Sequence, residues 1–350
     1  MIQYNGKYIF EGDISSGNPY RKDYLDSINK FIQEKYDESY SVRSIFNEKI
    51  TQEQEKYRKA FIDTIGQPVV PYPSSVPNAK FEYIGKDNFC NIYRVQIETM
   101  PEFWFYGIFM VPYNAEKAPL VIAQHGGGSL PEICSEFLGE SNYSYFTKRA
   151  LERGFAVFAP QLLLWKFNME NGESKTDIDI PYDRIALNNK LEHLGLSITG
   201  LEIFCIRRSI DYFHSLDYID ETRTAMMGLS YGGYFSMYTA AADPRIRSIY
   251  AAGFFNDRTK ICFPDWGYRN SANQFSDAEI AALCAPRRLQ IDVGKTDAVF
   301  DFVPSVEEGQ RAAQYYRRFH ASENFRYTVW DGGHRFDQSG KGFDFFFDGI

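Results

Sequence analysis

The pentapeptide G-L-S-Y-G at 228–232 constrains the fold of this chain more than any other feature. An apolar run at 224–227 precedes it, and a helix-like stretch at 234–242 follows it. Strand, G-x-S-x-G and helix in this order form the context in which a serine is held on a sharp turn with its hydroxyl exposed. The flanking glycines let the strand and the helix approach closely, because a Cβ at either position would clash. The pattern therefore indicates an α/β protein in which Ser230 is a nucleophile.

Two histidines follow Ser230 in the chain, His320 and His334. His334 lies in a loop with two glycines after the apolar run 325–330, whereas His320 ends a helix-like stretch, where a surface or capping role is expected. In α/β hydrolases the nucleophile, the acid and the histidine follow one another in this order. The order therefore predicts that His334 is the base.

The acid is expected between the serine and the histidine. The segment 289–293 has the pattern of a strand that ends at Gly294, and Asp297 follows three residues later on a loop from which a carboxylate can reach the histidine. Asp301, one turn further along, is the alternative, and Asp292 is a weaker candidate because it falls within the strand. We expect Asp297 to complete a Ser-His-Asp triad, with Asp301 left open.

A glycine-rich turn lies upstream of the predicted triad. The apolar run 119–124 leads into His125 and then into three glycines, which begin with Gly126 and Gly127. Such a turn after a strand lets backbone N–H groups converge on a developing oxyanion. We expect the oxyanion hole to be formed by N–H groups near Gly126 and Gly127 together with that of Tyr231. His125 is expected to be a structural hydrogen bonder, because it precedes the serine.

These residue types together predict acyl transfer through a covalent intermediate. A serine hydroxyl is a weak nucleophile until an imidazole takes its proton, which is the role expected of His334. Asp297 would hold the imidazole tautomer and stabilise the imidazolium without becoming protonated. This chemistry requires no metal and no organic cofactor, and the sequence offers no H-E-x-x-H, paired C-x-x-C or P-loop motif.

The chain resembles the α/β-hydrolase esterases of the dienelactone-hydrolase-like and acetyl-xylan-esterase group. The resemblance covers roughly residues 80–350, and more weakly the segment 58–68. It implies an α/β-hydrolase fold and ester hydrolysis. The stretches that carry it are 194–202 and 207–212 before the nucleophile strand, 219–223 before the G-x-S-x-G turn, and L-C-A-P-R-R-L at 283–289 before the acid.

Two positions depart from the pattern of that group. Dienelactone hydrolases proper use a cysteine as nucleophile, whereas this chain has Ser230. After the strand that ends near Ala159, members of the group often carry an aspartate and an arginine, whereas this chain continues with Pro160 and Gln161. The second departure leaves the substrate open.

The order of apolar and helix-like segments predicts the architecture. Alternating polar and apolar residues within 81–111 indicate an antiparallel entry to the sheet, and strand-like and helix-like segments then alternate up to residue 330. This alternation of strand-like and helix-like segments predicts an α/β-hydrolase fold, with a mostly parallel, doubly wound sheet and helices on both faces. Residues 1–77 are expected to form an N-terminal helical extension packed on the body, and residues 78–350 the catalytic domain.

Two irregular stretches are expected to wall the pocket. The stretch 161–189 contains Trp165, and the stretch 256–275 contains Trp266 and Tyr268. Long loops without secondary structure are usually functional or disordered, and their aromatic residues argue against disorder. We expect these three side chains to bind substrate by stacking on a sugar or a planar acyl group. Packing of the loops onto the body is the alternative explanation.

Charge and cysteine content exclude several classes of protein. The net charge of −8 and the pI near 5.3 argue against a nucleic-acid partner. No apolar run is long enough to span a membrane, and the five scattered cysteines do not suggest a disulfide framework. We expect a cytoplasmic protein, although a secreted protein whose signal peptide had been removed would look the same. The sequence is compatible with a homo-oligomer.

The combined pattern predicts a serine hydrolase that cleaves carboxylic esters, with acetyl groups on carbohydrates as the leading substrate and an oligosaccharide or small-molecule ester as partner. Three alternatives remain. A prolyl-oligopeptidase-like peptidase shares the triad, but the roughly 115 residues before the first catalytic loop are too few for its propeller. An acyltransferase would prefer an alcohol to water as acceptor. A non-catalytic hydrolase-fold protein would lack a triad residue.

Overall fold

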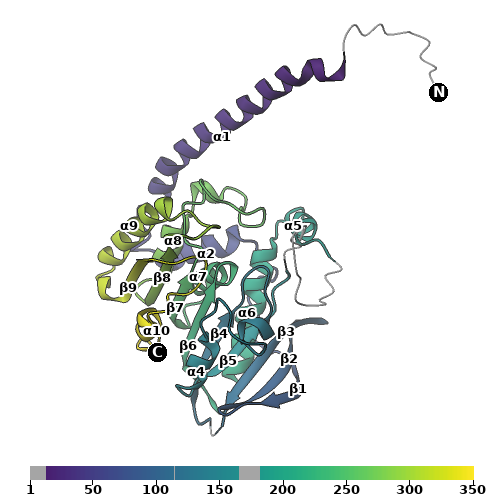
Figure 1. The fold of residues 1–350 in the computed structure, drawn as a ribbon, viewed down its shortest axis with the longest axis vertical. Coiled ribbons are helices and arrows are strands. Elements are labelled where there is room, and N and C mark those ends of the chain that lie inside the picture. Colours follow the sequence, from purple (N-terminus) through teal and green to yellow (C-terminus); the bar gives the residue numbers. More distant parts are fainter. Residues whose placement is uncertain (1–12, 114, 165–181) are drawn as a thin grey trace, which may run out of the picture.

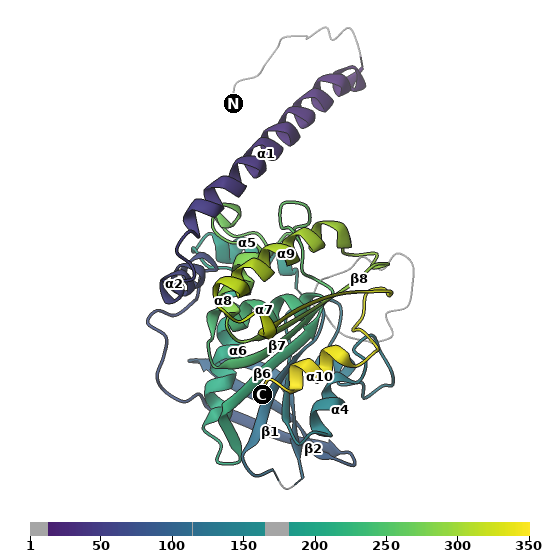
Figure 2. The ribbon, with the colours of Figure 1, turned by 90° about the vertical axis from the view of Figure 1, so that its left-hand side faces the viewer.

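A single mixed sheet forms the centre of the molecule. The computed structural model describes residues 13–113, 115–164 and 182–350, and within these ranges nine strands join in the order β1-β2-β3-β5-β4-β6-β7-β8-β9 (Figures 1 and 2). The strands are β1 (Ala79–Lys86), β2 (Cys90–Met100), β3 (Phe103–Pro112), β4 (Ala118–Gln124), β5 (Ala156–Pro160), β6 (Ile219–Leu229), β7 (Ile246–Ala252), β8 (Arg288–Gly294) and β9 (Phe325–Trp330).

The strand directions divide the sheet into two parts. Strands β1, β2, β3 and β5 pair with one another antiparallel, whereas all pairs from β5 through β4, β6, β7 and β8 to β9 are parallel. This arrangement confirms the predicted mostly parallel sheet with an antiparallel entry. Because parallel strands share one carboxyl-terminal edge, the loops after β4, β6, β8 and β9 can meet there.

Strand β4, at the centre of the sheet, is apolar up to its last residue because helices cover both faces of the sheet. All seven residues of β4 are buried. Leu120 and Ile122 belong to the core on one face, and Val121 and Ala123 to the core on the other. A strand buried on both sides shows no polar alternation, which is why the sequence reads as a short apolar run.

Figure 2 shows the helices on the two faces. Helices α6, α7, α8 and α9 contribute to the larger core, whereas α4 and α10 contribute to the other. Among the described residues, no helix is long and apolar enough to cross a membrane. The helices of the body are α3 (Pro131–Cys134), α4 (Phe146–Leu151), α5 (Arg184–Glu192), α6 (Ile198–His214), α7 (Tyr231–Ala242), α8 (Asp277–Cys284), α9 (Phe302–Arg318) and α10 (Lys341–Phe347), with short 3-10 turns η2 (Ser271–Asn273) and η3 (Ser322–Asn324).

Two helices precede the sheet, and they differ in how they contact the body. Helix α2 (Gln54–Thr64) packs on α7 and α8. Helix α1 (Asn18–Phe46), which follows the 3-10 turn η1 (Ile14–Gly17), is anchored only near its C-terminal end and extends away from the body (Figure 1). The expected domain boundary after residue 77 stays a prediction.

Candidate active site

Ser230 lies on a sharp turn between β6 and α7. Its backbone has φ +59° and ψ −122°, a conformation that residues with a side chain rarely adopt. The turn is tight enough to exclude side chains on both sides of the serine. A Cβ on Gly228 would lie 2.3 Å from the Gly232 carbonyl oxygen, and a Cβ on Gly232 would lie 2.2 Å from the carbonyl oxygen of Gln124. The two glycines are thus required by backbone packing, as the motif predicts.

Asp297 and His334 meet at the ends of β8 and β9. The Nδ1 atom of His334 lies 2.8 Å from Oδ2 of Asp297. The other carboxylate oxygen of Asp297 accepts hydrogen bonds from the backbone N–H groups of Val299, at 2.8 Å, and Phe300, at 3.1 Å. An ionised carboxylate can only accept, so Nδ1 of His334 carries the proton and Nε2 is left as a proton acceptor. This is the tautomer that a general base requires.

The nucleophile and the histidine face one pocket of about 420 Å³. Ser230 and His334 both line it, although they come from loops after different strands. Gly253, just after β7, has φ +61°, and a Cβ there would lie 3.4 Å from Nδ1 of His334. Sequence reasoning did not single out this glycine. The other residues that line the pocket are Gly126, Gly127, Gly128, Ser129, Ile133, Asn142, Tyr143, Leu229, Tyr231, Phe263, Trp266 and Val299.

The two alternative acids have other partners. Asp301 is the N-cap of α9, and its carboxylate accepts a hydrogen bond from the N–H of Val303 at 2.9 Å. Asp292 is buried within β8, where Tyr250 and Gln290 donate hydrogen bonds to it. Burial raises the pKa of the Asp292 carboxyl to about 6. In this geometry Asp297 is the carboxylate that contacts the histidine.

His125 is fully buried and makes structural hydrogen bonds. Its Nδ1 donates to the carbonyl oxygen of Gly126 at 2.7 Å, and its Nε2 accepts from the N–H of Leu162 at 2.9 Å. Both ring nitrogens are therefore engaged with backbone. Burial lowers the pKa of the His125 imidazole to about 4, so the ring is neutral at physiological pH.

The structure distinguishes among the expected oxyanion donors. The N–H of Gly126 donates to the hydroxyl of Tyr143 at 2.6 Å, so this donor is already engaged within the protein. Gly127 lines the pocket next to it. Tyr231 is the first residue of α7, so its N–H lies at a helix N-terminus, where the helix dipole favours negative charge. Gly127 and Tyr231 remain the candidate donors, and Gly126 supports the turn.

The three aromatic residues expected to bind substrate have different positions. Trp266 lines the pocket, but only 3% of it is exposed, and its ring stacks on Tyr234 at 4.4 Å between ring centroids. Its face is therefore covered by protein, and it forms a wall of the pocket rather than an open platform for a sugar. Trp165 lies outside the described residues.

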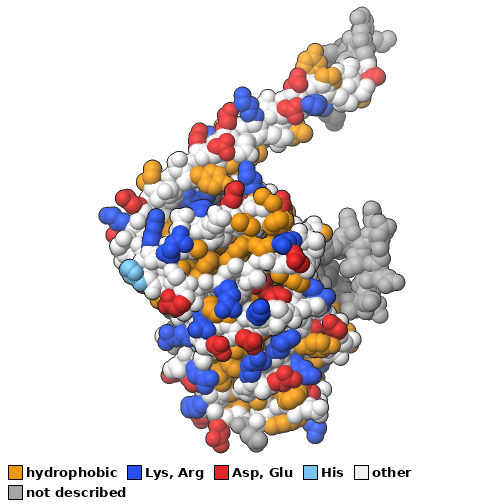
Figure 3. Space-filling view, turned by 60° about the vertical axis from the view of Figure 1, so that its left-hand side comes forward, with side chains coloured by type: hydrophobic (Ala, Val, Ile, Leu, Met, Phe, Trp, Pro, Cys, Tyr) orange, Lys and Arg blue, Asp and Glu red, His pale blue; other side chains and the backbone are white. Residues whose placement is uncertain are grey.

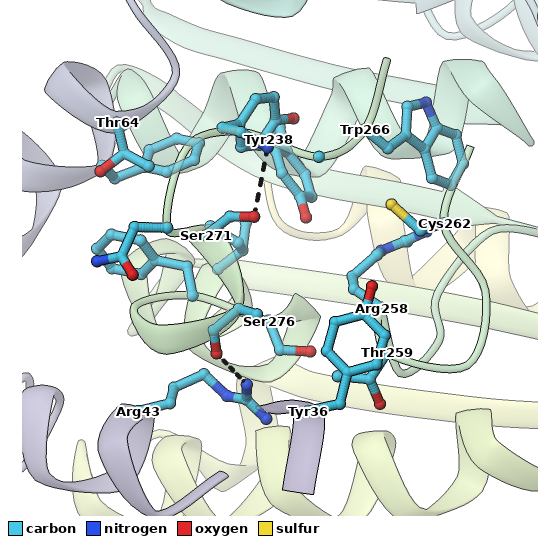
Figure 4. Close-up of a pocket in the computed structure, with 17 residues that line it drawn as sticks. Tyr36, Arg43, Thr64, Tyr238, Arg258, Thr259, Cys262, Trp266, Ser271 and Ser276 are labelled. Atoms are coloured by element: carbon cyan, nitrogen blue, oxygen red, sulfur yellow. Dashed lines mark hydrogen bonds between the residues drawn. The ribbon is translucent and has the colours of Figure 1, made fainter. Parts of the chain in front are cut away.

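Tyr268 does not line the pocket of Ser230. It lines a separate cavity of about 270 Å³ between α1, α2 and the loop 256–276 (Figure 4). Trp266 lines both, so the two spaces are neighbours in the structure. The sequence placed Trp266 and Tyr268 in one loop, but only the fold shows that Trp266 lines the pocket of Ser230 and Tyr268 does not.

A buried charge cluster lies behind Tyr231, and sequence reasoning missed it. The Arg184 guanidinium donates to both oxygens of Glu202, at 3.0 and 2.7 Å, and its Nε donates to Asp265 at 2.7 Å. The hydroxyl of Tyr231 also donates to Asp265. Glu202 in turn accepts from the N–H of Leu163 at 2.8 Å. The cluster ties the residue after the nucleophile to α5, α6 and the loop after β5.

The charged side chains of this cluster form ion pairs with one another. The side chains of Arg184, Glu202 and Asp265 are all more than nine-tenths buried. Burial raises the pKa of the Glu202 carboxyl, and Arg184 opposes this shift. No short motif marks these three residues in the sequence, because they come from separate segments and only the fold brings them together.

No protein-family model matches the chain. A protein of Bacillus subtilis (strain 168) named "Putative hydrolase YtaP" is 26% identical over 231 residues, which cover 60% of this chain and 74% of that protein.

Solved structures of esterases are similar in fold. A glucuronoyl esterase from Solibacter usitatus has a TM-score of 0.61 at 12% identity, covering 85% of this chain and 92% of that one. A protein of Bacteroides fragilis titled "putative acetyl xylan esterase" has a TM-score of 0.59 at 15% identity, covering 80% of this chain and 74% of that one. Acetyl xylan esterase 1 from Thermoanaerobacterium has a TM-score of 0.53 at 15% identity, covering 85% and 93%. The chain has the α/β-hydrolase fold, as predicted.

Proposed function

We propose that this protein is a serine hydrolase that cleaves carboxylic esters of small acyl groups, such as acetyl groups on carbohydrates, through an acyl-enzyme. One observation carries the proposal. His334 contacts Asp297 at 2.8 Å and shares a pocket with Ser230, while the three residues come from loops after three different strands. A nucleophile, a base and an orienting acid at one strand edge are the components of acyl transfer.

In the first half of the reaction, Nε2 of His334 takes the proton of the Ser230 hydroxyl as its Oγ attacks the ester carbonyl carbon. The tetrahedral oxyanion that forms is stabilised by N–H groups of Gly127 and Tyr231; one such donor typically lowers the barrier by about 3 kcal/mol. The imidazolium, held by Asp297, then protonates the alcohol oxygen as the C–O bond breaks. The alcohol leaves, and the acyl group remains on Ser230.

In the second half, water takes the place of the alcohol. His334 accepts a proton from water, whose oxygen attacks the acyl carbon, and the imidazolium returns a proton to the serine oxygen as the acyl–enzyme bond breaks. A carboxylic acid leaves, and the free enzyme is regenerated. Every step uses groups of this chain and water.

The pocket supports a small acyl group. Apolar side chains of Ile133, Phe263 and Val299 line it beside Ser230, and its volume of about 420 Å³ is near the lower end of the range for ligand pockets. The similar structures are named as esterases of carbohydrate substrates, which supports the same chemical class for this chain.

Turnover of p-nitrophenyl esters tests the proposal. We expect p-nitrophenyl acetate to be cleaved faster than esters of longer acids, and a proline p-nitroanilide to be cleaved slowly or not at all. Ser230→Ala is the control that removes the nucleophile. Cleavage of the anilide without turnover of the acetate would indicate a peptidase instead. A panel of acetylated oligosaccharides then identifies the alcohol side of the substrate.

Detection of the acyl-enzyme tests the mechanism. A fluorophosphonate should add once to the wild-type protein, at Ser230, and should not add to Ser230→Ala. Intact-mass spectrometry measures this addition. Labelling of the variant to the same extent would assign the nucleophile to another residue.

A further inference from the structure

The free part of α1 has one largely apolar face that none of the described residues 13–113, 115–164 and 182–350 covers. With about 100° of rotation per residue, its six large apolar side chains fall within an arc of about 140°, which also contains Arg21 near the N-terminal end and Lys35 near the body. All six are between 37% and 77% exposed. Figure 3 shows this helix standing clear of the body, with hydrophobic side chains on its surface. The six residues, called here the apolar stripe, are Tyr20, Tyr24, Leu25, Ile28, Phe31 and Ile32.

The opposite face of the helix is polar and satisfies its own charges. Lys22 pairs with Asp26 at 2.6 Å, and Lys30 with Glu34 at 3.8 Å, each one turn apart. Asn29 lies on this polar face. A helix with one polar and one apolar face is stable in water only when the apolar face is buried against a partner.

The apolar stripe continues a surface that is already an interface. Further along α1, Ser39, Arg43 and Phe46 point in the same direction as Leu25 and Ile28, and these three pack on the body. Arg43 is 1% exposed, donates to the carbonyl oxygen of Ala272 and pairs with Glu279. This anchored end fixes the direction of the helix. The apolar stripe therefore lies beyond the edge of the body, on the same side of the helix as the residues that pack on the body.

We propose that the apolar stripe binds the same stripe of a second copy of this chain, with the two α1 helices antiparallel about a two-fold axis. Large side chains exposed to this extent offer about 100 Å² each, so complete burial of the apolar stripe on both copies would remove about 1,200 Å² from water, which is at the lower bound of a specific interface. An isologous contact needs only one self-complementary patch. The antiparallel arrangement places the two bodies at opposite ends of the helix pair.

The charge of α1 favours a protein partner over a lipid surface. Residues 18–38 contain four basic and five acidic side chains, so this segment lacks the excess of lysine and arginine that attracts helices to anionic membranes. Near-neutral helices can approach one another without strong repulsion.

The mass of the full-length protein in solution tests the proposal. Sedimentation velocity and light scattering at micromolar concentrations should give twice the chain mass of 40.5 kDa, with the high frictional ratio of an elongated particle. Ile28→Asp should shift the protein to a monomer, because it places a charge at the centre of the apolar stripe. Asn29→Asp is the matched control: it adds the same residue to the same turn on the polar face and should leave the dimer intact.

Three results would overturn the proposal. The first is a wild-type protein that stays monomeric. The second is a dimer whose dissociation is the same in Ile28→Asp and Asn29→Asp. The third is a compact dimer with a low frictional ratio. Flotation of a monomeric wild type with phosphatidylcholine–phosphatidylglycerol vesicles, lost in Ile28→Asp, would assign the stripe to lipid and would also contradict it. Far-ultraviolet circular dichroism and p-nitrophenyl acetate turnover check that both variants are folded, since residue 28 is far from the pocket.

Discussion

Two neighbouring regions of this molecule hold charged and polar groups in different ways. On the rim of the sheet, His334 is partly exposed to the pocket and has one charged partner, Asp297. Behind α7, the side chains of Arg184 and Asp265 are buried, and Arg184 contacts Glu202 and the carbonyl oxygen of Leu163 as well as Asp265. Tyr231 connects the two regions, because it follows the nucleophile and donates to Asp265.

The comparison indicates a division of roles. Groups proposed to react must meet substrate and exchange protons, so they cannot be saturated with protein partners. Groups that fix the position of the turn gain from burial and mutual pairing, because hydrogen bonds and ion pairs are electrostatically stronger in the protein interior than in water. We therefore expect substitutions on the rim to change rate with little effect on stability, and substitutions in the buried cluster to change stability first.

The largest expected effect is on the rate of Ser230→Ala. Removing the nucleophile of a triad lowers kcat by about 10⁶-fold, while thermal unfolding should change little because no buried contact is lost. Ser129→Ala removes another hydroxyl from the same pocket, and its kcat should stay within about tenfold of the wild-type value. Ester turnover and calorimetry measure both. A Ser230→Ala protein with substantial activity would contradict the division of roles.

Asp297→Asn should lower kcat by about 10⁴-fold, because an amide can donate to Nδ1 and stabilise the wrong imidazole tautomer. Asp301→Asn is the matched control, since this residue lies four positions away and caps α9 instead. We expect it to retain nearly full activity. Steady-state kinetics on the two variants separates them, and a reversed result would assign the acid to Asp301.

Asp265→Asn should destabilise the fold by about 3–5 kcal/mol, because it leaves the buried Arg184 with an incomplete set of partners. The exposed ion pair of Arg153 and Asp344 is the control for the buried pair. Asp344→Asn should lower the free energy of unfolding by less than about 1 kcal/mol. Urea unfolding followed by fluorescence gives both values. Equal effects would show that burial does not distinguish the two pairs.

The smallest expected effect concerns the pH dependence of stability. The folded protein keeps His125 neutral down to about pH 4, whereas the unfolded chain binds a proton near pH 6.5. The contribution of His125 to the free energy of unfolding is therefore complete above pH 6.5. It falls by up to about 3 kcal/mol as the pH drops to 4. His125→Asn should flatten the curve in this window. Urea unfolding between pH 4 and pH 7 measures the difference, and parallel curves for wild type and variant would exclude it.

Local sequence patterns were sufficient to predict the fold class and the candidate triad. The G-x-S-x-G motif is recognisable because its residues lie close together in the sequence, although the Cβ clashes that require Gly228 and Gly232 also involve Gln124 of the neighbouring strand β4. Asp297 and His334 could be predicted because each lies shortly after a strand, and strand ends of a parallel sheet share one edge. Their catalytic roles stay predictions.

Several features could not be predicted because they depend on contacts between distant segments. The Gly126 N–H donates to Tyr143, seventeen residues away, so only the fold shows that this amide is engaged. Tyr268 and Trp266 are two positions apart in the chain, but only Trp266 lines the pocket of Ser230 in addition to the cavity that both residues share.

The sequence alone determined which residue types are present, in which order and beside which strands, because short-range sterics and hydrophobic periodicity act along the chain. Tertiary structure decided which of these groups touch. It assembled Arg184, Glu202 and Asp265 behind the nucleophile and directed α1 away from the body. Pairing of buried charges depends on the approach of elements far apart in the chain, and no local pattern encodes that approach.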